Sequence, residues 1–304
     1  MLRSPANSGP DRRGVSGQPG EGGLLAAPVA GAVMGTDPGF SSWSEASIGS
    51  GGCFARPLPL DGTCASAARR LFRESVAGLS LPADLLHDGV TMVSELAANT
   101  LHAQGKVEFS GSRQRPVSGM PELWVYLRGQ GAGCELVCKV FDSGPSWRDD
   151  QPRPGMAAPD SVSGRGLQVV AELSGGRWGT QPTRGRLGSW KVPGKAVWFA
   201  LRVPAAAGLR PGRGELADAG GVDDLEAMIV DRGLGARMVR VDDPAAPVSV
   251  LSISRYLTVW RSGDTVTWRT PAGGYQRAQL SDLVEAAEQI VCAHEELARS
   301  PDGR

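Results

Sequence analysis

Residues 82–103 read PADLLHDGVTMVSELAANTLHA and predict a long amphipathic helix. Its apolar side chains recur at spacings of three and four, which places them on one face: Leu86, Val90, Val93, Ala97 and Leu101. Pro82 suits the first turn of a helix, and Gly105 is typical of a residue just past its end. A separate polar stripe carries Asp88, Glu95, Asn99 and His102. We therefore expect one face of the helix to pack on a core and another to present polar side chains.

Glu95 and Asn99 lie four residues apart on this predicted helix, so their side chains are neighbours on its surface. A carboxylate can orient or deprotonate a hydroxyl group or a water molecule. An amide oxygen beside it can complete the coordination of Mg²⁺, which prefers hard oxygen ligands and usually keeps several waters. The same pair is also typical of an ordinary solvated helix face, so its meaning depends on the motifs that follow.

Two strands are predicted further along the chain, from Leu123 to Arg128 and from Glu135 to Phe141. Asp142-Ser143-Gly144-Pro145 follows the second strand directly. A carboxylate at a strand end presents a hydrogen-bond acceptor, and the glycine after it lets a ligand approach the backbone closely. These four residues also make a good turn, which leaves a structural interpretation of Asp142 open.

Gly164-Arg165-Gly166-Leu167 opens a short helix that is predicted over residues 164–173. Glycines at a helix start expose backbone N–H groups at the positive end of the helix dipole, an arrangement that suits phosphate. Arg165 adds a charged hydrogen-bond donor at the same place.

In their order along the chain, these motifs resemble the GHKL ATPase superfamily, which has the Bergerat ATP-binding fold, and more closely its bacterial anti-sigma-factor serine/threonine kinases. Residues 95–103 are similar to the N box of that family, residues 140–145 to its first glycine box and residues 164–173 to its second. Residues 177–179 and 194–198 resemble the strands that close the domain. The first glycine box departs from the family pattern, because Pro145, Ser146 and Trp147 stand where a second glycine is common.

The resemblance implies an α+β fold: a two-layer α/β sandwich of the histidine-kinase and Hsp90-like ATPase type, with helices on one face of a mainly antiparallel sheet. Nucleotide would lie between the Asn99 helix and a lid formed by residues 145–163. Carried over by position, Asp142 would accept a hydrogen bond from the adenine amino group, and Gly144 would let the base approach. Asn99 would hold Mg²⁺, and Glu95 would be the general base. The phosphates would be lined by Gly164, Arg165, Gly166 and Leu167.

The function implied by the resemblance is that of an ATP-binding regulatory protein. Its fullest form is a cytoplasmic serine/threonine kinase that phosphorylates a protein antagonist and acts by partner switching, with a sigma factor or the anti-sigma-factor antagonist as partner. A homodimer is compatible with the family. The alternative is a non-catalytic ATP-binding interaction module, which the irregular first glycine box and the extra C-terminal segment favour. A sensor histidine kinase fragment fits less well, since residues 1–52 cannot supply a phospho-accepting helical hairpin.

Four regions are expected along the chain. Residues 1–52 are rich in Gly, Ser, Pro and Ala and are predicted to be disordered. Residues 53–204 carry the ATP-binding motifs, and residues 205–221 read as a linker. Residues 222–304 predict a small α+β domain, in which a last helix packs on strands and turns Glu285, Glu288, Glu295 and Glu296 to solvent.

The amino-acid composition argues against several classes of function. The chain has 304 residues, with 32 Lys or Arg and 32 Asp or Glu, so its formal net charge is zero. That balance argues against direct electrostatic binding of nucleic acid or of an anionic membrane surface. The sequence also has no apolar run of the roughly 20 residues that a membrane span needs. The five scattered cysteines lack zinc-ligand spacing and suit a reducing cytosol as buried apolar side chains.

Overall fold

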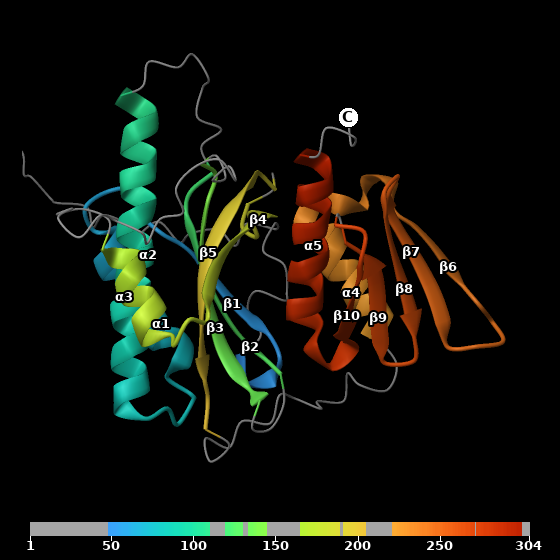
Figure 1. The fold of residues 1–304 in the computed structure, drawn as a ribbon, viewed down its shortest axis with the longest axis horizontal. Helices are drawn as coiled ribbons and strands as arrows, with labels where there is room; N and C mark the ends of the chain where they lie inside the picture. The colour runs from blue at the N-terminus through green and yellow to red at the C-terminus, as the bar shows by residue number, and fades with distance from the viewer. Residues whose placement is uncertain are drawn as a thin grey trace, which may run out of the picture. The chain divides into compact units, whose positions relative to one another are not determined.

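Two five-stranded antiparallel sheets organise the part of the chain that the structure describes (Figure 1). The computed structural model describes residues 48–109, 119–129, 133–144, 165–188, 191–204, 221–270 and 272–299, with the backbone alone for Ser50 and residues 102–109. All of them belong to one compact unit, residues 37–304. Residues 1–47 of the expected disordered segment, the lid, Gly164 and nearly all of the expected linker lie outside these residues, as does the His102 side chain. The expectation of disorder is wrong for the last five residues of that segment, because Ile48–Ser50 form a 3₁₀ turn and Ile48 is buried.

The first sheet, here called sheet A, has the strand order β1-β2-β3-β5-β4. Its strands are β1 (Cys53–Pro57), β2 (Glu122–Arg128), β3 (Glu135–Asp142), β4 (Trp178–Arg184) and β5 (Pro193–Arg202). Three helices cover one face of this sheet (Figure 1): α1 (Cys64–Val76), α2 (Ala83–Phe109) and α3 (Gly166–Leu173). The helices and the sheet share one apolar core, because every second side chain of the central strands points toward them.

Alternation along the strands divides sheet A into two buried faces. Val125 of β2, Cys138 of β3 and Phe199 of β5 belong to the core under the helices. Their neighbours Trp124, Val137 and Ala200 belong to a second core on the opposite face. The central strands are therefore apolar on both sides, which explains their nearly continuous burial.

The second sheet, sheet B, is built from the C-terminal part of the chain in the order β10-β9-β8-β7-β6. Its strands are β6 (Val239–Asp242), β7 (Val248–Ser254), β8 (Leu257–Ser262), β9 (Thr265–Arg269) and β10 (Tyr275–Gln279). The helices of this region are α4 (Gly221–Ile229), a π-helical turn at Val230–Leu234, and α5 (Leu283–Arg299). Short 3₁₀ turns lie at Ile48–Ser50, Gly235–Arg237 and Leu280–Asp282.

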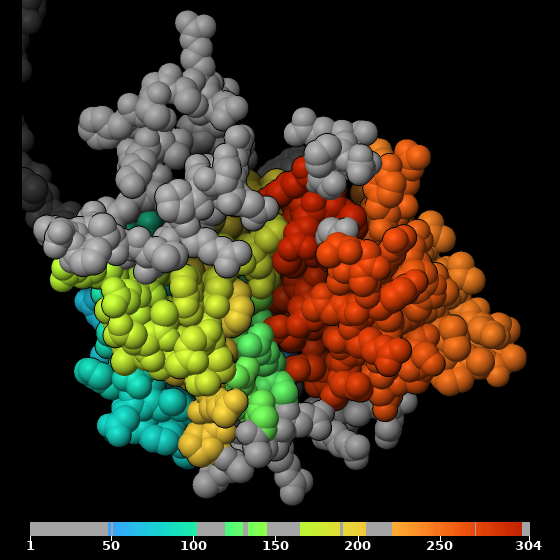
Figure 2. Space-filling view, viewed as in Figure 1, coloured from blue at the N-terminus to red at the C-terminus, as the bar shows by residue number. Residues whose placement is uncertain are grey.

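Helix α5 joins the C-terminal region to sheet A. Its Ala286, Ile290 and Val291 share one apolar core with Trp124 of β2 and Trp268 of β9. Figure 2 shows the red surface of α5 against the yellow and green surface of sheet A. Sheet A is thus covered by α1–α3 on one face and by α5 on the other.

The mixed α+β class expected from the sequence is confirmed, and the two predicted strands and the short predicted helix lie within two residues of β2, β3 and α3. The predicted end of the long helix near Gly105 is wrong, because α2 continues to Phe109. A single glycine inside a helix costs about 1 kcal/mol, which continued helical hydrogen bonding can offset.

The predicted orientation of the acidic side chains on α5 is wrong for three of four. Glu285, Glu288 and Glu295 are buried, and only Glu296 is exposed. The expectation assumed that α5 packs on its own strands alone. In the structure, α5 lies between sheet A and sheet B, so its charged side chains meet basic partners on sheet A instead of water.

Among the described residues, no helix combines the length and the apolarity that crossing a bilayer requires. All five cysteines are free, and four of them are buried. Burial raises the pKa of the Cys138 thiol well above its ordinary value, so this thiol is protonated and unreactive at neutral pH.

Candidate functional site

Helices α2 and α3 bring together two of the motifs that the sequence analysis singled out. Glu95 lies on α2, and Gly166 is the first residue of α3. A Cβ atom placed on Gly166 would lie 2.5 Å from Oε2 of Glu95, closer than any real side chain allows. The absence of a side chain at Gly166 therefore lets the Glu95 carboxylate lie against the first turn of α3. The positive end of the helix dipole favours an acidic group at this position.

Asn99 lies one turn beyond Glu95 on α2 and is half-buried. Its Nδ2 atom is buried and has no hydrogen-bond partner within the described part of the chain. A buried N–H donor without a partner is uncommon, and it can be completed by an acceptor such as a water molecule or a ligand oxygen. The expected neighbours Glu95 and Asn99 thus lie on one helix, and Nδ2 of Asn99 has no acceptor among the described residues.

Asp142 ends β3, and its side chain points toward α1–α3 in register with Val140 and Cys138. The residue is 1% exposed. Its Oδ1 atom accepts a hydrogen bond of 2.9 Å from the backbone N–H of Gly144, which is the local turn expected from the sequence. The same oxygen accepts a second hydrogen bond of 2.7 Å from the ammonium group of Lys195. Asp142 therefore both stabilises the turn after β3 and forms a buried ion pair with Lys195.

Lys195 of β5 is a site residue that the sequence analysis did not identify. Antiparallel pairing of β3 with β5 sets Lys195 directly opposite Asp142. Its side chain is on the helix-covered side, in register with Val197 and Phe199, and the residue is 4% exposed. One sequence signal could have found it, namely a lone lysine entering the apolar run Ala196–Leu201, because an unpaired ammonium is almost never buried.

The other residues expected at the site lie at the start of α3. Arg165 is exposed and occupies the N-cap position of this helix. Leu167 is buried in the core beneath the helices, where it anchors α3 on sheet A. Its expected contact with a nucleotide stays a prediction. Gly164 and the lid residues 145–163 lie outside the described residues.

The residues that the structure describes fit a magnesium nucleotide better than a metal held by the protein alone. They contain no cluster of three or more His, Cys, Asp or Glu side chains that could hold a metal ion. Mg²⁺ in nucleotide sites keeps waters and phosphate oxygens and needs only one or two protein ligands. The unsatisfied Nδ2 of Asn99 is a hydrogen-bond donor, which fits a phosphate oxygen of such a group.

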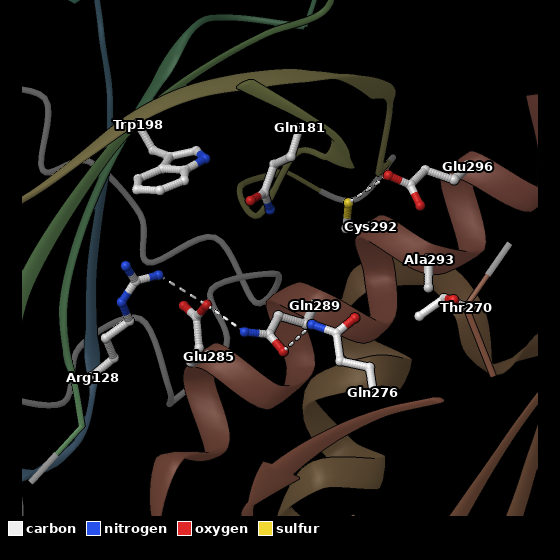
Figure 3. A pocket seen from close by; sticks show the side chains of 10 residues that line it. All are labelled: Arg128, Gln181, Trp198, Thr270, Gln276, Glu285, Gln289, Cys292, Ala293 and Glu296. Atoms are coloured by element: carbon white, nitrogen blue, oxygen red, sulfur yellow. Dashed lines mark hydrogen bonds and ion pairs between the residues drawn. The ribbon is translucent and has the colours of Figure 1, made fainter. Parts of the chain in front are cut away.

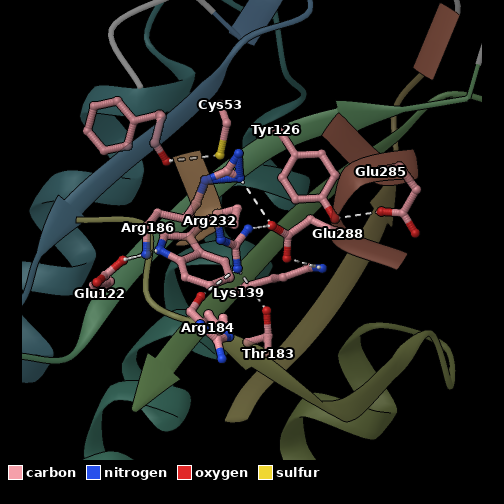
Figure 4. Close-up of polar contacts among 12 residues, drawn as sticks. Cys53, Glu122, Tyr126, Lys139, Thr183, Arg184, Arg186, Arg232, Glu285 and Glu288 are labelled. Carbon is pink, nitrogen blue, oxygen red and sulfur yellow. Dashed lines mark hydrogen bonds and ion pairs between the residues drawn. The ribbon is translucent and has the colours of Figure 1, made fainter. Parts of the chain in front are cut away.

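A second polar cluster, here called the buried ionic network, lies on the opposite face of sheet A (Figure 4). Three cations converge on the fully buried carboxylate of Glu288 from α5. Nζ of Lys139 lies 3.2 Å and Nη1 of Arg186 3.1 Å from its oxygens, and Nη1 of Arg232 forms a further ion pair. Arg232 also donates a hydrogen bond of 2.8 Å to Thr183. The network therefore ties β3, β4 and the π-helical turn to α5.

The charges of this network shift the pKa of Glu288. Burial would raise that pKa, but the positive charges of Arg232, Lys139 and Arg186 outweigh burial and lower it to about 2. Glu122 lies beside the same cluster and has a raised pKa, because its burial outweighs the hydrogen bonds that it accepts from Arg186 and Trp124. Glu288 is thus held in its charged form at neutral pH by three neighbours.

A cavity of about 280 Å³ lies between sheet A and α5 (Figure 3). Trp198 of β5 and Gln181 of β4 line one side, and Gln289 and Cys292 of α5 line the other. The Gln181 amide points into the cavity, and its Nε2 atom has no hydrogen-bond partner among the described residues. Gln289 accepts a hydrogen bond from Gln276 and donates one to Glu285. None of the expected site residues that the structure describes lines this cavity.

Comparison of the chain with models of protein families and with curated proteins finds no match.

Proposed function

We propose that this chain is an ATP-binding regulatory protein whose nucleotide site lies between α2, α3 and the end of β3. The observation that carries the proposal is the contact of Glu95 with Gly166, because it joins a candidate base to the helix start that would face phosphate. The buried acceptor Asp142 and the unsatisfied amide of Asn99 support it from the two other expected positions. These are the positions at which the sequence resembles the GHKL ATPases.

Each residue has a physical role in this proposal. Asp142 accepts a hydrogen bond from the amino group of adenine, and Gly144 gives the base access to that carboxylate. Asn99 contributes an amide oxygen to Mg²⁺. The first turn of α3, with Arg165 and Gly166, offers backbone N–H groups and a guanidinium group to the phosphates. Positioning and charge neutralisation of this kind are the main requirements of phosphoryl transfer.

In its catalytic form the protein is a serine/threonine kinase that acts on a protein antagonist of the anti-sigma-factor type. Bound Mg-ATP supplies the γ-phosphoryl group and the metal charge. Glu95 takes the proton of the attacking serine or threonine hydroxyl as the new oxygen–phosphorus bond forms and ADP leaves. Glu95 is half-buried and lies beside the first turn of α3.

The alternative is a non-catalytic module in which nucleotide sets the conformation of a partner-binding surface. The C-terminal region favours it, because α5 and the buried ionic network join that region to the back of the same sheet. A sigma factor or its regulator remains the proposed partner in both forms, with the cytoplasm as the proposed compartment.

Calorimetric titration with Mg-ATP tests the nucleotide site. We expect binding by the wild-type chain and a loss of roughly 10- to 100-fold in affinity for Asp142→Ala, the effect of a hydrogen bond to a charged group. Asp242→Ala is the matched control, because Asp242 ends β6 in sheet B and is exposed. Failure of the folded wild-type chain to bind Mg-ATP contradicts the proposal.

Glu95→Gln distinguishes the kinase from the non-catalytic ATP-binding module. The substitution keeps the shape of the side chain and removes its basicity. A kinase would keep its affinity for Mg-ATP and lose transfer of the γ-phosphoryl group, by a factor of about 100 or more. A non-catalytic module would bind ATP and act on its partner unchanged.

A further inference from the structure

The buried pair of Asp142 and Lys195 needs a physical explanation. Burial of two charges is costly, and replacement of a buried ion pair by apolar residues is often neutral or stabilising. The next inward residues on the same face, Val140 and Val197, are apolar and fully or almost fully buried. A purely structural position beside them would accept an apolar pair equally well. The charged pair therefore points to a role in binding.

Gly144 lies directly against both charged groups, which are themselves buried. A Cβ atom at Gly144 would lie 2.7 Å from Oδ1 of Asp142 and 3.2 Å from Nζ of Lys195. Any side chain at this position would cover the carboxylate and the ammonium together. A group that approached the pair past Gly144 would therefore meet an acceptor and a donor at once.

The pair also has unused hydrogen-bonding capacity. Both hydrogen bonds to Asp142 in the described part of the chain fall on Oδ1, and Lys195 uses one of its three N–H donors for that oxygen. Oδ2 can therefore accept a hydrogen bond while Lys195 donates another. An adjacent acceptor and donor complement the edge of adenine, where the 6-amino group is a donor and ring nitrogen N1 beside it is an acceptor.

We propose that Lys195 is a specificity-determining residue that donates a hydrogen bond to N1 of adenine while Asp142 accepts one from the 6-amino group. The inference rests on the proposed function, since it assigns a second base contact to the same nucleotide site. Recognition then depends on two groups of the base, and a purine with a different donor and acceptor order binds more weakly. GTP, whose corresponding edge carries O6 and N1–H, has that reversed order.

Nucleotide analogues test this assignment one contact at a time. In 1-deaza-ATP a C–H group replaces N1, and purine riboside triphosphate lacks the 6-amino group. We expect the wild-type chain to bind each analogue about 10- to 100-fold more weakly than ATP in calorimetric titrations with Mg²⁺. Lys195→Met should bind ATP and 1-deaza-ATP with nearly equal affinity and still discriminate against purine riboside triphosphate. Lys195→Gln keeps an N–H donor and should keep part of the preference for ATP over 1-deaza-ATP.

Lys191→Met is the matched control, because Lys191 lies just before the same strand and contacts Arg186 and Asp231 instead. This variant should keep the wild-type ratio of affinities for ATP and 1-deaza-ATP, and the ratio for ATP and purine riboside triphosphate. Each ratio compares two ligands on one protein, so a fraction of misfolded variant cancels from it. Equal binding of ATP and 1-deaza-ATP or of ATP and GTP by the wild-type chain, or unchanged discrimination by Lys195→Met, would overturn the inference. Absence of any ATP binding by the folded wild-type chain would instead overturn the proposed function, and this inference with it.

Discussion

Single residues set the contact between α2 and α3. Gly166 has no side chain, and the space that a Cβ would fill holds the Glu95 carboxylate. The rest of the α2–α3 contact is apolar, through Leu167 and Val170. The position of Glu95 is therefore sensitive to a single methyl group, whereas the fold is not.

Gly166→Ala should lower the rate of phosphoryl transfer without lowering thermal stability. The clashing atom is the far end of a flexible side chain, so Glu95 can turn aside. Alanine also favours a helix over glycine by about 0.5–1 kcal/mol, and we expect thermal stability to stay equal or to rise slightly. The displaced carboxylate should lower phosphoryl transfer at least about tenfold. Gly78→Ala is the control, because a Cβ there meets no atom within 4 Å. Equal transfer rates for the two variants would contradict the assigned role of Glu95.

Among the elements, α5 shows how a helix can be charged on its buried side. Its apolar residues fill the core shared by the two sheets, and its glutamates pair with side chains that sheet A and its connections supply. Glu295 accepts a hydrogen bond of 2.6 Å from Arg184, and Glu285 accepts one of 2.6 Å from the Tyr126 hydroxyl. Each buried carboxylate therefore has a partner outside α5.

Glu288→Gln tests how much the ion pairs between α5 and its basic neighbours contribute to the free energy of unfolding. The substitution removes the only carboxylate that Lys139, Arg186 and Arg232 share in the described structure, so three buried cations repel one another. Breaking a buried ion pair typically costs on the order of 3 kcal/mol. Glu296→Gln on the same helix is exposed and should change the free energy of unfolding by less than about 0.5 kcal/mol. Urea unfolding curves compare them, and equal midpoints would show that the network adds no net stability.

At the scale of the whole molecule, residues of both sheets and of α5 contribute to one apolar core. Residues of β2, β3 and β5 share one apolar core with residues of sheet B and α5. The ionic network crosses the same boundary. Residues 53–204 and 222–304, which the sequence divides into separate regions, thus depend on each other for burial.

Acid should unfold both sheets in one transition. The folded-state pKa of Glu288 is about 2, below its ordinary value of 4.5. A lowered pKa contributes stability that is fully present above about pH 4.5 and is lost as the pH falls toward 2, because the unfolded chain takes up the proton more readily. We expect amide protons of β3 in sheet A and β8 in sheet B to lose hydrogen-exchange protection together over this range. Loss in two separate steps would show that residues 222–304 fold independently. Glu288→Gln should remove part of the acid dependence.

The local sequence pattern by itself determined the main helices and strands of sheet A and the candidate site residues on them. The apolar spacing of α2, the alternation in β3 and β5 and the glycines at α3 predict elements and candidate residues, since helix and strand periodicity depend on near neighbours along the chain. Glu95, Asn99 and Asp142 were selected in this way.

Tertiary structure decided what those residues meet. The partner of Asp142 is Lys195, 53 residues away, and only the register of β3 against β5 sets them opposite each other. The acidic side chains of α5 read as a solvated face, because a polar helix surface looks the same in sequence whether water or a buried cation covers it. The choice between these two environments rests on contacts between distant segments, and sequence periodicity carries no information on them.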